Sequence, residues 1–95
     1  MPEDASAEVK DNTARSRFEL VEQGQLAFAD YARSGDRLVI PHVEAAPGLR
    51  GTGAAGRLME GVLAAARSEG LKVTPLCGYA AAYIRRHRQH HDLLG

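Results

Sequence analysis

The sequence predicts a small mixed α/β domain, with α+β character in the order of its strands and helices. Three observations predict this class. Apolar and polar residues alternate between residues 18 and 43, interrupted by two short turns. A glycine-rich run at residues 50–56 then leads from a strand pattern into helical spacing. An apolar segment at residues 71–74 comes next, and a second helical pattern follows it.

Three strands joined by tight turns account for the alternating region. The first strand begins at Phe18 and ends at a turn formed by Gln23-Gly24. The second runs from Leu26 to Ala32 and ends at Ser34-Gly35-Asp36, and the third covers Leu38 to Val43. Strands connected by such short turns pair as an antiparallel three-strand meander.

A helix is expected from about Thr52 to Glu69, with Gly70 at its C-terminal stop. Its apolar stripe consists of Ala55, Leu58, Val62, Ala65 and Ala66. The side expected to face water carries Arg57, Glu60, Arg67 and Glu69. Gly61 costs a helix about 1 kcal/mol relative to alanine, which suggests that it packs closely against the sheet.

The remaining segments complete one domain over residues 15–95. Residues 71–74 form a strand parallel to the third one, because a helical crossover connects the two. A second helix is expected from Tyr79 to Arg88, followed by a short tail at residues 90–94. Residues 1–14 are polar and charged without periodicity, so we expect a flexible N-terminal tail there.

The composition excludes several classes of function. Twelve basic residues balance twelve acidic ones, and aromatic residues are sparse without any tryptophan, so we expect no nucleic-acid partner. No apolar run reaches membrane-spanning length, and the acidic N-terminus lacks the apolar core of a signal peptide. The lone Cys77 rules out an intrachain disulfide and suits a reducing compartment. We therefore expect a cytoplasmic protein.

The glycine-rich run favours an anion site. Its turn leaves backbone N–H groups free at the positive end of a helix dipole, an arrangement that can hold a diphosphate. It is not a Walker A loop, because no Lys-Ser or Lys-Thr follows the glycines, and its strand does not open a Rossmann unit. A tight strand-to-helix turn without a ligand is the alternative. The run consists of Arg50, Gly51, Thr52, Gly53, Ala54, Ala55 and Gly56.

These segments, in this order, resemble the GNAT-type N-acetyltransferases. The acetyl-CoA loop of that superfamily reads Gln/Arg-x-x-Gly-x-Gly/Ala, and Arg50, Gly53 and Ala55 match its three defined positions. A short single-domain subfamily with a Pro-x-Cys motif after the last strand is more similar still. Its motifs correspond to residues 42–45, 71–77 and 82–87, so that the likeness spans residues 17 to 94. Val43 stands where the subfamily has Thr, and Gly78 where Pro is common.

The resemblance implies a GNAT-like fold and acetyl-CoA as cosubstrate, with acetyl transfer to an amine of an unknown small molecule or protein. The pyrophosphate would bind backbone donors of the loop from Arg50 to Ala55. The pantetheine arm would pair with the strand backbone like an added strand, although ordinary sheet pairing is the alternative there. These strand residues are Val43, Glu44 and Ala45.

Four residues are candidates for catalysis. Cys77 follows a strand and precedes a helix, where dipoles favour a thiolate and an acyl-cysteine intermediate; a buried, inert thiol is the alternative. Glu44 is a candidate general base, with a solvated carboxylate as the alternative. His42 shares its sheet face, so the two could relay a proton or form a structural pair. The resemblance assigns Tyr83 to protonation of the departing CoA thiolate, although Tyr79, Tyr83 and His87 also have the spacing of a packing stripe.

The remaining candidates concern metals and partners. His87, His90 and His91 offer no compact set of four ligands, so we expect solvated tail histidines and no metal. Arg85, Arg86 and Arg88 form a solvated basic face, with attraction of CoA phosphates as the alternative. A monomer or weak homodimer is expected. A CoA-binding regulatory module with little turnover is the second candidate function, and a structural domain without cofactor the third.

Overall fold

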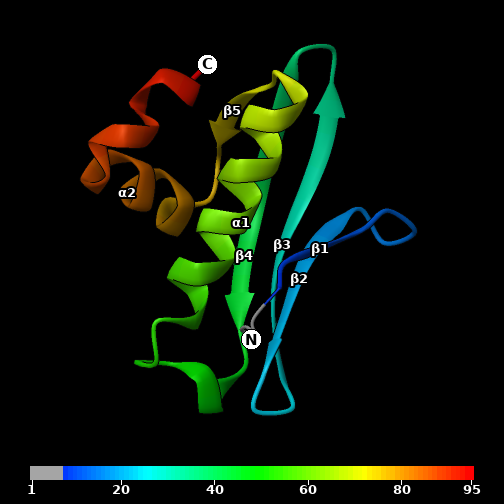
Figure 1. The fold of residues 1–95 in the computed structure, drawn as a ribbon, viewed down its shortest axis with the longest axis vertical. Helices are drawn as coiled ribbons and strands as arrows, with labels where there is room; N and C mark the ends of the chain where they lie inside the picture. The colour runs from blue at the N-terminus through cyan, green and yellow to red at the C-terminus, as the bar shows by residue number, and fades with distance from the viewer. Residues whose placement is uncertain (1–7) are drawn as a thin grey trace, which may run out of the picture.

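The computed structural model describes residues 8–95, which form one five-stranded sheet with helices against it (Figure 1). The strands are β1 (Lys10–Asn12), β2 (Arg17–Glu22), β3 (Gln25–Ser34), β4 (Arg37–Ala45) and β5 (Lys72–Pro75). The α-helices are α1 (Ala54–Glu69) and α2 (Gly78–Arg86), and the short 3-10 helices are η2 (Pro47–Leu49) and η3 (Arg88–Leu93). The mixed α/β class and the order of its elements are confirmed.

The strand order is β1-β2-β3-β4-β5, so neighbours in sequence are neighbours in the sheet. The pairs from β1 to β4 are antiparallel, as the predicted meander requires. Strand β5 pairs parallel to β4, because α1 carries the chain back along the sheet before β5 begins. The parallel ladder is short and ends with Ile40 opposite Pro75.

The flexible tail predicted for residues 1–14 includes residues that form a strand. Residues 10–12 form β1, which pairs with β2 from Lys10 opposite Glu19 to Asn12 opposite Arg17. The Tyr31 hydroxyl of β3 donates to Asp11 Oδ1 at 2.6 Å and anchors β1 further. Polar cross-strand contacts hold this strand, so apolar alternation did not reveal it. The first seven residues of the expected tail lie outside the described part of the chain.

Both helices pack on the same face of the sheet and share one core with it. Buried side chains of β2, β3 and β4 meet the apolar stripe of α1, while α2 packs on β4 and β5. Alanines at the centre of β3 leave room for the helix, because they add little bulk beneath it. The buried residues at this contact include Phe18, Leu20, Ala27, Ala29, Leu58, Val62, Ala66, Ala80 and Ile84.

Gly61 packs closely, as expected, but against another partner than the predicted one. A Cβ at this position would lie 2.3 Å from Cγ2 of Val9, which precedes β1. The segment before β1 therefore crosses α1 at its glycine. A pattern confined to the helix does not identify the segment that crosses it.

A bulge in β4 determines which side chains face the helices. Between β3 and β4 the register steps by two residues on β3 (Asp30 to Ala32) and by three on β4 (Val39 to His42). Ile40 therefore points to the core before the bulge and Val43 after it. The odd step turns the even-numbered residues at the end of β4 to the face without helices.

The C-terminal segment is part of the fold rather than the expected free tail. Helix α2 ends at Arg86, and the chain then returns to β5, where Gly95 N–H donates to Val73 O at 3.0 Å. Lys72 Nζ donates to Asp92 O at 2.6 Å, and Leu93 is buried in the core. These contacts close the side of β5 that faces away from β4.

Candidate active site

A cleft opens where β4 and β5 separate. Ile40 O accepts two hydrogen bonds at 3.0 Å, from Leu76 N–H and Cys77 N–H, and this is the last link between the two strands. Strand β4 continues to Ala45, while the segment after β5 turns away into α2. A cavity of ≈ 540 Å³ occupies the gap, within the range of small-molecule sites. It is lined by His42, Val43, Glu44, Ala45, Arg50, Ala55 and Tyr79.

The end of β4 directs backbone groups into this cleft. Ala46 N–H donates to Leu26 O of β3 at 2.9 Å, which establishes the phase of the antiparallel pairing. Glu44, two residues earlier, therefore bonds to β3 as well, whereas Val43 and Ala45 belong to the alternate positions. Their N–H and C=O groups point away from β3, toward the space that β5 has left. An extended ligand can pair with this edge as a further strand does.

The glycine loop adopts a backbone conformation that suits glycine. Gly51 and Gly53 have φ of 79° and 87°, in the left-handed region that side chains disfavour. Gly53 is the N-cap of α1, so the helix begins directly after it. The helix therefore starts at Ala54, two residues later than predicted from the sequence. The tight turn and the helix start together bring the loop to the mouth of the cleft.

Hydrogen bonds of Thr52 hold the loop, while backbone N–H groups in the first turn of α1 have no acceptor within the helix. The hydroxyl of Thr52 donates to Leu49 O at 2.6 Å and accepts from Ala54 N–H at 3.2 Å. Arg57 N–H donates to Gly53 O at 3.0 Å and closes the first helical turn. The N–H groups of Ala55 and the residue after it lie between these two and have no acceptor within the helix. Free N–H groups at the positive end of a helix dipole can hold an anion.

Arg57 is exposed, as predicted, and it also braces the loop. Its guanidinium donates to both carboxylate oxygens of Glu22 at 2.7 Å and to Thr52 O at 3.1 Å. It also lies beside Gly53, where an added Cβ would come within 2.9 Å of Nη1. The hydrogen bonds from Arg57 lower the pKa of the Glu22 carboxyl group. The loop is thereby tied to the hairpin between β2 and β3.

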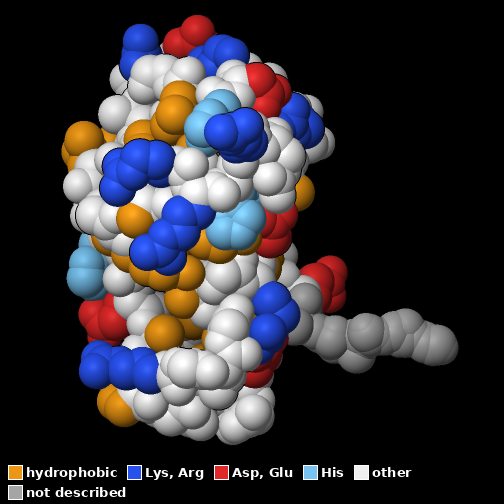
Figure 2. Space-filling model, turned by 90° about the vertical axis from the view of Figure 1, so that its left-hand side faces the viewer, with side chains coloured by type: hydrophobic (Ala, Val, Ile, Leu, Met, Phe, Trp, Pro, Cys, Tyr) orange, Lys and Arg blue, Asp and Glu red, His pale blue; other side chains and the backbone are white. Residues whose placement is uncertain are grey.

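The cleft opens on a basic side of the molecule. Figure 2 shows the side on which α2 lies: Lys and Arg side chains are spread over it, with hydrophobic side chains exposed between them. Arg50 lines the cavity, and Arg85 and Arg86 lie in the last turn of α2. A positive surface attracts anionic ligands even though the chain as a whole carries no net charge.

His42 and Glu44 form a contact on the face without helices, which confirms that they share one sheet face. His42 Nε2 and Glu44 Oε1 are 2.9 Å apart, and the two side chains are 53% and 57% exposed. Both residues also line the cleft. A carboxylate next to an imidazole can accept and pass on a proton.

The family of the chain is shown by comparison with known proteins. A family model described as GCN5-related N-acetyltransferase matches residues 17–93. The chain belongs to this family. An NMR solution structure of a GCN5-like protein from Staphylococcus aureus has the same fold as this GCN5-related N-acetyltransferase domain, with a TM-score of 0.67. The two chains are 22% identical, and the match covers 93% of this chain and 87% of the other. No curated protein matches the sequence.

Two residues at the start of α2 in this N-acetyltransferase domain lie in places that their predicted roles did not suggest. Cys77 is the N-cap of α2, is half-buried and packs against the core, and is not among the residues that line the cavity. Tyr79, which the sequence placed only in a packing stripe, does line it. Burial raises the pKa of the Tyr79 hydroxyl. The spacing of four residues on one helix gives no hint of which tyrosine reaches the cleft.

Tyr83 directs its hydroxyl to α1. The hydroxyl donates to Glu60, and the ring stacks on His87 with centroids 4.0 Å apart, as in the packing stripe that the sequence left open. Burial, and then the Glu60 carboxylate, raise the pKa of the Tyr83 hydroxyl. The role predicted for Tyr83 at the thioester would require this hydrogen bond to break.

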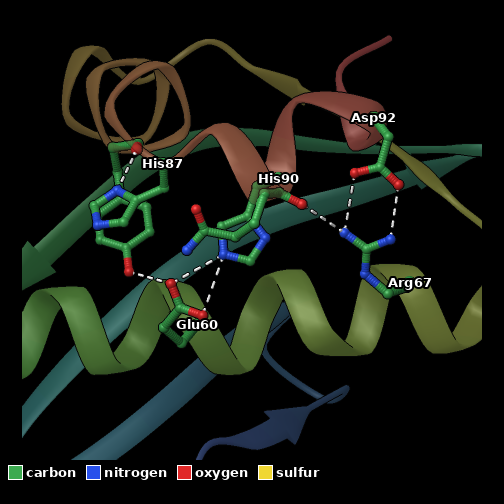
Figure 3. Close-up of polar contacts among 7 residues, drawn as sticks. Glu60, Arg67, His87, His90 and Asp92 are labelled. Carbon is green, nitrogen blue, oxygen red and sulfur yellow. Dashed lines mark hydrogen bonds and ion pairs between the residues drawn. The ribbon is translucent and has the colours of Figure 1, made fainter.

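Glu60 is exposed as predicted, whereas His90 is not the solvated tail histidine that the sequence predicted. His90 is only 8% exposed, and its Nε2 lies 3.0 and 3.1 Å from the two carboxylate oxygens of Glu60 (Figure 3). The hydrogen bond from Tyr83 lowers the pKa of Glu60. One carboxylate on α1 thus binds both α2 and η3. The side chain of Arg67 makes a parallel contact with Asp92, at 2.7 Å (Figure 3).

Two general classes of site are not found in residues 8–95. This part of the chain has no group of three His, Cys, Asp or Glu side chains that could hold a metal ion. None of the helices in this part of the chain is long and apolar enough to cross a membrane.

Proposed function

We propose that this domain is an acetyl-CoA-dependent N-acetyltransferase that acetylates an amine. One observation carries the proposal: the unpaired edge of β4 leads directly to a glycine loop at the N-terminus of a helix. The edge suits an extended amide-bearing arm, and the loop suits a diphosphate. Coenzyme A contains both groups, joined in that order. Membership of the N-acetyltransferase family supports acyl transfer as the reaction.

We expect the two parts of the cosubstrate to bind along one line. The diphosphate would accept hydrogen bonds from the N–H groups of the loop and of Ala55, with Arg50 at the entrance. The pantetheine amides would pair with the N–H and C=O groups of Val43 and Ala45. The thioester would then lie next to Glu44 and His42, at the point where β4 leaves β5.

The chemical step would use groups that face the cleft. The amine nitrogen attacks the thioester carbonyl carbon while Glu44, directly or through His42, takes the proton that the nitrogen loses. A carbon–nitrogen bond forms, the carbon–sulfur bond breaks, and coenzyme A leaves with the electron pair on sulfur. Tyr79 is placed to return a proton to that thiolate. We assign this role to Tyr79 because Tyr83 already donates to Glu60.

Direct transfer is preferred over an acyl-cysteine route. Cys77 packs against the core beside the cleft, whereas His42 and Glu44 line it. An acyl-cysteine would also require the thiol to turn away from its apolar contacts. The amine therefore attacks acetyl-CoA itself.

Calorimetric titration of acetyl-CoA tests the proposal with a matched pair of variants. Ala55→Glu places a negative charge in the first turn of α1, where it favours the helix but repels a diphosphate. Ala64→Glu places the same charge on an exposed position of the same helix. We expect Ala55→Glu to weaken binding at least roughly tenfold and Ala64→Glu to leave it unchanged. Equal affinity of the two variants, or no binding by the original protein, would contradict the proposal.

A CoA-binding module with little turnover is the second candidate function. It is favoured by the exposure of His42 and Glu44, which leaves an acceptor no enclosed pocket on that side. Tight acetyl-CoA binding without acetylation of any amine in a broad panel would support it.

A further inference from the structure

The face of the sheet without helices presents an ordered array of side chains. Register places residues of β2, β3 and β4 opposite one another in two rows. Contacts within the array agree with this register: the ring centroids of Phe28 and His42 are 6.0 Å apart, and the Arg17 guanidinium lies 4.6 Å from the Phe28 ring. One row holds Arg17, Asp30 and His42, and the other holds Glu19, Phe28 and Glu44.

This array adjoins the proposed reaction centre. His42 and Glu44 belong to it and also line the cleft. The opposite side of the sheet is filled by buried core residues such as Ala80 and Ile84. An acceptor must therefore approach a thioester at the end of β4 across the face without helices.

The charges of the array favour a cation. It contains three carboxylates and one guanidinium, and Arg17 pairs with Glu19 at 2.5 Å. Glu44 contacts His42. Asp30 forms no ion pair with any other residue of the segment 8–95, and it lies diagonally across from Glu44 on the neighbouring strand. A bound amine therefore meets one carboxylate at the cleft and a second one at a distance.

The distance between the carboxylates of Asp30 and Glu44 indicates the length of the acceptor. Diagonal neighbours on adjacent strands lie about 7–8 Å apart, so Asp30 and Glu44 are separated by about that distance. The other diagonal joins Phe28 and His42, whose rings lie between the two carboxylates. A chain of five methylene groups spans such a distance and has an apolar surface to lie on.

Resting on the proposed function, we propose that the acceptor is a linear α,ω-diamine. One amine reaches the thioester beside Glu44 and is acetylated. The other stays protonated and pairs with Asp30, and the methylene chain crosses Phe28 and His42. The array thus selects amines that carry a second positive charge.

Initial rates of CoA release from acetyl-CoA test this with the full chain and two acceptors, 1,5-diaminopentane and 5-amino-1-pentanol. We expect a kcat/KM about fivefold higher for the diamine, which is the effect of one exposed ion pair. Asp30→Asn should abolish that preference and leave the amino alcohol unaffected. Asp36→Asn, in the turn between β3 and β4, removes the same charge outside the array and should change neither rate.

The outcomes separate this inference from the function on which it rests. Acetyl-CoA binding is measured by calorimetry on the same samples. A protein that binds acetyl-CoA but acetylates both amines equally, or neither, overturns the acceptor assignment alone. Equal losses with both amines in Asp30→Asn overturn it as well. Absence of acetyl-CoA binding overturns the proposed function together with the inference.

Discussion

The two-residue spacing of His42 and Glu44 matters because the bulge in β4 turns both to the face without helices. In the proposed reaction, Glu44 removes the proton from the amine. We therefore expect Glu44→Gln, which keeps the size of the side chain but removes its basicity, to lower kcat by at least about 100-fold. The Kd of acetyl-CoA should stay unchanged, since the variant keeps the β4 edge. An unchanged kcat in steady-state assays would exclude Glu44 as the base.

Direct transfer makes a prediction for Cys77. Cys77→Ala should retain most of the activity, because the thiol contacts the core and the proposed direct transfer does not use it. Intact-protein mass spectra of the unmutated chain with acetyl-CoA alone should show no acetyl adduct. An adduct that disappears in the variant, together with loss of activity, would establish the covalent route instead.

For single residues, the sequence predicted which side chains lie beside the cleft better than it predicted which tyrosine reaches it. Val43, Glu44, Ala45, Arg50 and Ala55 were predicted beside the cofactor, and all of them line the cavity. Their motif is local, so a short stretch of sequence carries it. The choice between two tyrosines on one helix depends on how α2 packs on α1, and that contact joins residues far apart in the chain. Their catalytic and binding roles stay predictions.

Among the elements, α2 and η3 depend on one carboxylate of α1. Glu60→Ala would leave the buried His90 and the Tyr83 hydroxyl without their acceptor. We expect a loss of about 1–3 kcal/mol in the free energy of unfolding, the cost of a buried group without its partner. Urea denaturation measures it.

Glu69→Ala is the matched control for this effect. It removes a carboxylate from the same helix, where the partner is the partly exposed Arg33. We expect this variant to lose less than about 1 kcal/mol. A loss from Glu60→Ala no larger than that of the control would contradict the role of Glu60.

At Gly61 we expect replacement by alanine to loosen the structure, the opposite of its usual effect in a helix. Replacing a helical glycine with alanine ordinarily stabilises by about 1 kcal/mol. Here the new Cβ would lie 2.3 Å from Val9, so the segment before β1 must move. We expect Gly61→Ala to reduce the hydrogen-exchange protection of β1, and Val9→Ala to restore it in the double variant. Unchanged exchange in Gly61→Ala, together with higher stability, would show that this contact is loose.

The elements that the sequence missed lack a periodic signal of their own. Strand β1 is three residues long and polar, and it depends on partners in β2 and β3. The C-terminal segment is held by backbone groups of β5 and by Leu93. Such contacts join distant parts of the chain, whereas the meander, α1 and β5 have apolar patterns of their own and were predicted correctly.

For the whole molecule, we expect hydrogen bonds and ion pairs to carboxylates to make the free energy of unfolding fall at acid pH. The folded-state pKa values of Glu19, Glu22, Glu60 and Asp92 are lowered, chiefly by hydrogen bonds from Arg17, Arg57, Tyr83 and Arg67 respectively. A group with a lowered pKa stabilises the fold above its unfolded value, 4.5 for Glu and 3.8 for Asp, and loses that effect as the pH falls through the folded value.

Urea denaturation at several pH values measures this effect. We expect a constant free energy of unfolding from pH 7 down to about pH 5, and a clear decrease by about pH 3. Equal values at pH 7 and about pH 3 would show that these contacts add nothing to the fold.

The order and direction of strands β2 to β5 followed from the sequence because each connection between them obeys a local rule. Tight turns give antiparallel neighbours, and a helical crossover gives a parallel one. The bulge follows from no such rule, yet it decides which residues of β4 face the acceptor side. The proposed function thus depends on a feature that only the three-dimensional structure reveals.

An NMR titration of the ¹⁵N-labelled protein with acetyl-CoA reports on each backbone N–H group separately, and therefore on where the cosubstrate binds. We expect the largest shifts at the N–H groups of Val43, Ala45, Gly53 and Ala55, along the edge of β4 and the start of α1. Shifts confined to other parts of the sheet, or no shifts at saturating acetyl-CoA, would contradict this binding mode.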